Sequence, residues 1–137
     1  MNRDDLKELA SIRLRDARVL LENGNYEGAY YLCGYVIECA LKACIAKQTR
    51  QYDFPDRKTV IDSYTHDLTK LVKTAELEGS LEKDMAQDKD LADNWTIIRD
   101  WSEESRYQKH SEKKAHDLYY AIAGRKNGVL QWIEQHW

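Results

Sequence analysis

The chain has 137 residues, a length that suits a single domain, residues 1–137, with a hydrophobic core of useful size. Its hydrophobic fraction of 42% and charged fraction of 33% indicate a globular protein with a charged surface, and its net charge of −3 argues against a chain that coats nucleic acid nonspecifically. Six Gly and one Pro among many helix formers predict an all-helical fold.

The first predicted helix runs from Asp4 to Leu21, where Leu and Ala residues recur at three- and four-residue spacing. Gly24 suits the position just past its end, and Asn25 can cap the helix that follows. A connection this short predicts that the first two helices are antiparallel neighbours.

The second predicted helix, Asn25 to Lys47, is apolar on nearly all sides, which predicts that other helices cover it. Glu38 lies at its centre. A buried carboxylate without a partner costs several kcal/mol, so a cation must lie close to it or the group must be neutral. Lys42 follows four residues later on the same helix and can pair with Glu38.

All three cysteines, Cys33, Cys39 and Cys44, lie on this second helix and point in different directions at about 100° per residue. We interpret them as buried, reduced thiols, and we expect neither a metal ion nor a cofactor. Glu38 and Lys42 interrupt the apolar run, which falls short of a membrane span, and the charged N-terminus does not resemble a signal peptide. These features predict a cytoplasmic protein that does not bind a membrane.

The second half of the chain predicts three more helices after a loop over residues 48–64. The first begins at Thr65 and lasts about three turns, the second runs from Leu81 to Trp101, and the third runs from Ser111 to Trp132. A polar segment separates the second helix from the third. No strand alternation or repeat is visible. The pattern predicts an antiparallel up-and-down bundle of about five helices.

Two features of the last predicted helix leave alternatives open. Gly124 and Gly128 either permit close approach of a neighbouring backbone or mark a frayed end. Trp132, Ile133 and Trp137 form an apolar terminus, which favours a partner, most simply a second copy of the chain.

Four motifs occur in the order typical of one superfamily. The first two lie in "RLRDARVLLENGNYEGAYYLCGYVIECALKA" (13–43): its arginine-x-x-aspartate-alanine opening, and the element of Glu38, Ala40, Leu41 and Lys42 near its end. The other two are "THDLTKLV" (65–72) and "WTIIRDWSEESRY" (95–107), with its tryptophan and arginine-tyrosine elements. Together they resemble the HEPN superfamily over most of the chain. The resemblance implies a helical bundle that usually forms a homodimer.

The resemblance implies one of two kinds of function. Some HEPN proteins are metal-independent ribonucleases of toxin, defence and RNA-processing systems, with an arginine and a histidine separated by four to six residues. Here Arg106 and His110 are separated by three residues, and Tyr107 stands where a polar amide is common. Other members are noncatalytic modules that accompany nucleotidyltransferases or bind nucleotides or proteins.

In the ribonuclease reading, His110 takes the proton from the ribose 2′-hydroxyl and Arg106 stabilises charge on the phosphate. If residues 106–110 are helical, these two side chains lie on one face. The family pattern also motivates the hypothesis that Glu38 orients Arg106, with a simple Glu38–Lys42 pair as the alternative. We expect Glu38, Lys42 and Tyr107 to belong to a binding site beside this pair.

Other aromatic and histidine side chains have simpler interpretations. We expect His66 to be structural, and we assign no role to His116 or His136. The tyrosines could stack bases, but at helical spacing they are more typical of a bundle rim or a dimer face.

The preferred hypothesis is a noncatalytic binding or interaction module that accompanies a nucleotidyltransferase or a stress, defence or toxin–antitoxin system and binds nucleotide or nucleic acid. The main alternative is a metal-independent ribonuclease that uses Arg106 and His110. A third reading is a scaffold without a ligand.

Overall fold

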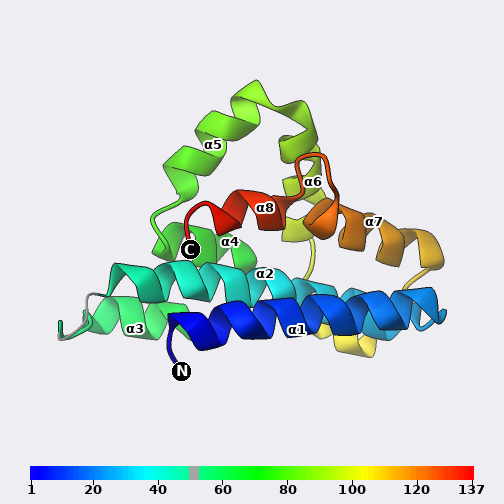
Figure 1. The fold of residues 1–137 in the computed structure, drawn as a ribbon, viewed down its shortest axis with the longest axis horizontal. Coiled ribbons are helices and arrows are strands. Elements are labelled where there is room, and N and C mark those ends of the chain that lie inside the picture. Colours follow the sequence, from blue (N-terminus) through cyan, green and yellow to red (C-terminus); the bar gives the residue numbers. More distant parts are fainter. Residues whose placement is uncertain (50–52) are drawn as a thin grey trace.

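The computed structural model describes residues 1–49 and 53–137, and within these ranges it contains eight α-helices, one 3-10 helix and no strand (Figure 1). The all-helical class predicted from composition is therefore confirmed. In chain order the elements are α1 (Arg3–Glu22), α2 (Tyr26–Gln48), α3 (Arg57–Ser63), α4 (Leu68–Thr74), α5 (Glu78–Gln87), α6 (Lys89–Arg99), the 3-10 helix η1 (Glu103–Tyr107), α7 (Glu112–Ala123) and α8 (Val129–Glu134).

The two longest helices, α1 and α2, form the antiparallel pair that the sequence predicted (Figure 1). Asn2 and Asp5 form a reciprocal capping box at the start of α1. After α1, Gly24 adopts a φ of +78°, a left-handed conformation that favours glycine, and the chain reverses into α2.

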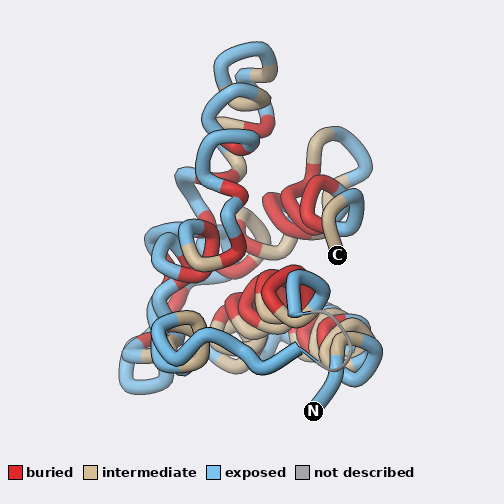
Figure 2. Tube along the Cα trace, turned by 90° about the vertical axis from the view of Figure 1, so that its left-hand side faces the viewer, coloured by how far each residue is buried: buried red, intermediate tan, exposed pale blue. Residues whose placement is uncertain are grey.

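Helix α2 is the central element of the fold, also as predicted. It contacts α1, α4, η1, α7 and α8, and most of its residues are buried (Figure 2). The expectation that this apolar run falls short of a membrane span was wrong, because α2 is by length and composition apolar enough to cross a membrane. However, 67% of the apolar 18-residue window in α2 is buried inside the fold. Its apolar character therefore serves the interior of the bundle.

Four predicted boundaries were wrong. The helix predicted to begin at Thr65 begins at Leu68, after its cap Asp67. The loop predicted over residues 48–64 contains α3, which Asp56 caps by accepting from the backbone N–H of Thr59, while residues 50–52 lie outside the described part. The helix predicted from Leu81 to Trp101 is two helices, because Asp88 leaves helical geometry and caps α6 through the N–H of Leu91.

The last predicted helix is also divided, into α7 and α8. Gly124 follows α7 and Gly128 precedes α8. A Cβ at Gly124 would lie 2.5 Å from the carbonyl oxygen of Tyr120, and one at Gly128 would lie 2.6 Å from that of Gly124. The two glycines thus allow neighbouring backbone to approach closely in a tight turn between two helices, which agrees with the first of the two alternatives.

The chain itself covers the apolar C-terminus, so this terminus gives no reason to expect a partner. Trp132 and Ile133 are buried in the main core, and Trp137 is half-buried beneath the ammonium of Lys7, which lies 5.2 Å from its ring centroid. Helix α8 packs against α2, α6 and α7, while α5 extends away from them with most of its residues exposed (Figure 2).

Candidate functional site

Glu38 is buried at the middle of α2, with only 4% of its surface exposed. Its carboxylate accepts a hydrogen bond from Nδ1 of His66, and Nζ of Lys42 lies 3.8 Å from Oε1. The predicted Glu38–Lys42 pair is present, but the closer partner is a histidine for which the sequence predicted only a structural role.

His66 joins three segments of the chain. It precedes α4, its Nδ1 meets Glu38 on α2, and its Nε2 lies 3.1 Å from Oε2 of Glu103 on η1. The two ring nitrogens of His66 thus lie against two carboxylates, and the ammonium of Lys42 is the cation nearest to the buried Glu38 along α2.

The hypothesis that Glu38 orients Arg106 was wrong. Among the described residues Glu38 forms ion pairs with Lys42 and His66, whereas Arg106 is exposed and its guanidinium lies 4.7 Å from the ring centroid of Tyr107. Hydrogen bonds to the hydroxyl groups of Tyr107 and Tyr31 raise the pKa of Arg106.

His110 is buried and faces the bundle, with 5% of its surface exposed. Its ring stacks on Tyr30 of α2 at a centroid distance of 3.9 Å and an interplanar angle of 19°. Nε2 donates to the backbone carbonyl of Ser105 over 3.2 Å, while Nδ1 is buried with no hydrogen-bond partner among the described residues.

The structure does not place Arg106 and His110 on one helical face. Helix η1 ends at Tyr107, and Gln108 is extended, with φ −114° and ψ 155°. Arg106 therefore lies in solvent beside Tyr107, which is 74% exposed, while His110 turns back toward α2. The condition for convergence on one phosphate, a continuous helix over residues 106–110, is not met.

Aromatic side chains of α2 hold the segment that contains η1. Tyr35 meets Trp101 edge to face at 5.3 Å and contacts His66 at 5.9 Å, and its hydroxyl lies 3.1 Å from that of Tyr31. Burial and the hydrogen bond to Tyr31 raise the pKa of Tyr35. Gly34 lies directly beneath Trp101, so that a Cβ there would stand 1.9 Å from the indole ring.

A cleft of about 380 Å³ opens beside His66 between the start of α4 and the segment leading into η1. Its lining carries four carboxylates, from Asp67, Asp100, Glu103 and Glu104, beside the guanidinium of Arg99 and the imidazole of His66. Carboxylates outnumber cations here, so the cleft itself does not favour a phosphate group.

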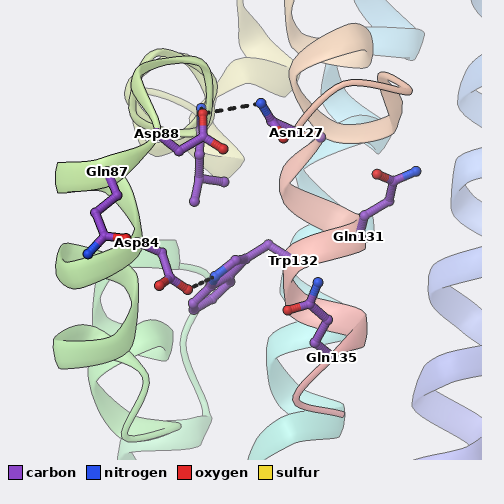
Figure 3. Close-up of a pocket in the computed structure, with 9 residues that line it drawn as sticks. Asp84, Gln87, Asp88, Asn127, Gln131, Trp132 and Gln135 are labelled. Atoms are coloured by element: carbon purple, nitrogen blue, oxygen red, sulfur yellow. Dashed lines mark hydrogen bonds between the residues drawn. The ribbon is translucent and has the colours of Figure 1, made fainter.

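A second hollow, of about 410 Å³, lies between α5 and α8 (Figure 3). Trp132 crosses it and donates from Nε1 to Oδ2 of Asp84 at 2.8 Å, and Asn127 donates to Oδ1 of Asp88 at 3.2 Å. Its remaining polar groups are glutamine amides, with no cation in the lining. Figure 3 shows that both hydrogen bonds run from one wall of the hollow to the other, so these polar groups hold the two walls together.

Sequence reasoning missed His66 as the closest partner of Glu38, and Glu103 as the second partner of His66. The only signal was indirect: the "THDL" motif places His66 just before a helix and Asp67 at its cap, where Asp67 accepts from the N–H of Lys70. Nothing in the local spacing relates residues 38, 66 and 103, because the contacts depend on how three segments pack.

Comparison with known proteins gives one result. A family model described as "HEPN domain" matches residues 4–135, which is nearly the whole chain. We find no significant match among curated proteins or among solved structures.

Proposed function

The chain belongs to the HEPN domain family, and from this premise we propose that it is a noncatalytic module that binds nucleotide or nucleic acid. The observation that carries the proposal is the position of His110. A general base must reach the proton that it removes, directly or through one water. The ring of His110 is instead stacked on Tyr30, with its Nε2 engaged by the carbonyl of Ser105.

Arg106 supports the binding part of this proposal. Its guanidinium is exposed, forms no ion pair with any described acid, and lies against the ring of Tyr107. A planar guanidinium grips phosphate through paired N–H donors, and an exposed tyrosine ring offers a face on which a base can stack. The two side chains could therefore contact a nucleotide while His110 takes no part.

A metal-independent ribonuclease is the second candidate, and one observation favours it. Nδ1 of His110 and Oγ of Ser105 are both buried without a hydrogen-bond partner among the described residues. Each such group costs about 1–3 kcal/mol, so the segment that contains His110 has unmet hydrogen bonds in this conformation. Cleavage would require this segment to move and bring His110 to the surface beside Arg106.

One experiment separates the two candidates. Labelled single-stranded and structured RNA are incubated with the wild-type protein and with His110→Ala in the presence of a chelator, and binding is followed in the same samples by fluorescence anisotropy. We expect intact RNA, with binding that weakens in Arg106→Gln. Cleavage by the wild type that disappears in His110→Ala would overturn the proposal.

The proposal extends to a protein partner, either a second copy or a nucleotidyltransferase of a stress, defence or toxin–antitoxin system. Phe54, Ile61 and Tyr64 around α3 are large apolar side chains that stand exposed, and such a surface suits a protein contact. Light scattering of the wild type and of Ile61→Asp measures whether a second copy binds there, since a monomer in both cases would exclude this arrangement.

A further inference from the structure

A groove between the second half of α1 and the last turns of α7 combines aromatic rings with two arginines. It has a volume of about 360 Å³. The side chains that matter here are Arg18, Glu22, His116, Tyr119, Tyr120 and Arg125. None of them belongs to the Arg106–Tyr107 surface or to the Glu38–His66–Glu103 cluster.

The wall formed by α7 is an aromatic ledge. His116 and Tyr120, four residues apart, have nearly parallel rings, with an interplanar angle of 10° and centroids 5.9 Å apart. Tyr119 stands edge-on to Tyr120 at 5.4 Å and 88°. Tyr120 is 58% exposed, so part of its ring remains available for stacking after these contacts are made.

The cations lie at the edges of this ledge. Arg18 uses Nε to bind Oε1 of Glu22 at 2.9 Å, and its two terminal nitrogens make no hydrogen bond to any described residue. Arg125 follows Gly124 in the turn after α7, is exposed, and forms no ion pair with the described acids. Two guanidinium groups beside a ring match a phosphate next to a base.

Two features oppose an anion in this groove. Glu22 lines it, and α7 ends here, so the negative pole of this helix dipole faces the groove. Each effect is modest at an exposed site. Together they predict that a lone phosphate binds poorly and that the aromatic ledge must supply the remaining affinity.

We propose that the α1–α7 groove is a binding site for a nucleobase that carries a 5′-phosphate, with the base on Tyr120 and the phosphate between Arg18 and Arg125. This inference rests on the proposed function and gives it a second contact surface. The ligand is either a free nucleotide or one residue of a single strand. In a strand, the groove and the Arg106–Tyr107 surface would hold different residues of the chain.

The test measures binding of uridine, UMP and a labelled oligouridine strand to the wild type and to Tyr120→Ala, Arg125→Gln and Glu22→Gln. We expect Tyr120→Ala to weaken binding of the strand about tenfold, since base stacking accounts for that much affinity. Arg125→Gln should weaken it about fivefold and remove the preference for UMP over uridine. Glu22→Gln should tighten it about threefold, because it frees Arg18 and removes a negative charge.

Matched controls are available at α3 and its C-cap, where Arg57→Gln removes an exposed guanidinium and Tyr64→Ala removes a ring that is 83% exposed, against 58% for Tyr120. Both should bind as the wild type does, and circular dichroism checks that every variant is folded. A strand that binds tightly while UMP does not would assign the site to nucleic acid, and equal affinity per nucleotide would assign it to free nucleotides.

The proposal that the groove binds a nucleotide is refuted if the Tyr120 and Arg125 variants bind the strand as well as the wild type does. If Arg106→Gln loses binding in the same experiment, the proposed function survives. If the wild type binds none of the three probes, the proposed function itself fails. Cleavage of the strand contradicts the noncatalytic part alone, and the affinities of the groove variants still decide the groove.

Discussion

The ion pair between Glu38 and His66 can be tested by a double-mutant cycle. Replacing His66 with Ala removes the hydrogen bond to a carboxylate that is 4% exposed and leaves that carboxylate with Lys42 alone, at 3.8 Å. Replacing Glu38 with Gln removes the buried charge but keeps an amide oxygen that can still accept from Nδ1 of His66.

The expected magnitudes follow from burial. Breaking a buried ion pair by removing one partner costs about 3–5 kcal/mol. The side chain of His66 is 43% exposed, however, so water and Lys42 replace part of what is lost. We therefore expect His66→Ala to lower the free energy of unfolding by about 2 kcal/mol, and Glu38→Gln to change it by less than about 1 kcal/mol.

In the double variant the loss should be smaller than the sum, because the neutral amide introduced by Glu38→Gln leaves no charge unpaired. The coupling free energy should be about 1–2 kcal/mol, measured by urea unfolding followed by circular dichroism. The matched control is Arg106→Gln, which should add to Glu38→Gln within about 0.5 kcal/mol. Additivity for His66 together with coupling for Arg106 would refute the reasoning.

Two further predictions concern the packing of α2. Gly34→Ala should destabilise the protein by at least about 3 kcal/mol, because the new Cβ would lie 1.9 Å from the buried ring of Trp101. Gly79→Ala, which meets nothing within 4 Å on α5, should raise the unfolding free energy by about 0.5 kcal/mol, so equal effects of the two substitutions would contradict the packing. Burial raises the pKa of the Cys33 thiol to about 12, so iodoacetamide near about pH 8 should alkylate the half-buried Cys39 well before Cys33, as read by mass spectrometry. Faster reaction at Cys33 would show that α2 is not the buried helix described.

The sequence predicts the central position of α2 well because apolar residues occupy nearly every side of this helix. A helix with apolar residues on nearly every side has to be covered, and α2 is. The same logic identified Glu38 as a carboxylate in need of a cation, and Lys42 as one partner, since both lie on one helix at a fixed spacing.

Helix breaks were predictable only where a residue forces them. Gly24 marks the turn after α1. Asp88, by contrast, interrupts a helical pattern that continues on both sides of it, and its role depends on a contact with Asn127 from the far wall of the hollow. Aspartate is a residue type that favours N-caps, but nothing in the sequence around Asp88 shows that it also bonds to Asn127.

The contacts that Glu38 and His66 make with other segments could not be predicted from the sequence for the same reason. Glu38 meets His66, and His66 meets Glu103, because α2, the residue before α4 and η1 pack together, and residue spacing does not show that packing. The predicted convergence of Arg106 and His110 failed because it assumed a helix over residues 106–110, where the chain leaves its 3-10 turn at Gln108.

Acylation of histidines by diethyl pyrocarbonate tests most directly the claim that His110 is withheld from the surface. The reagent modifies accessible imidazole nitrogens, and mass spectrometry locates the sites. We predict that His116, which is about two-fifths exposed, is modified in the free protein, while His110 stays unmodified both in the free protein and in the protein saturated with RNA. Modification of His110 at the rate of His116 would contradict the account and place the second candidate, a ribonuclease, first.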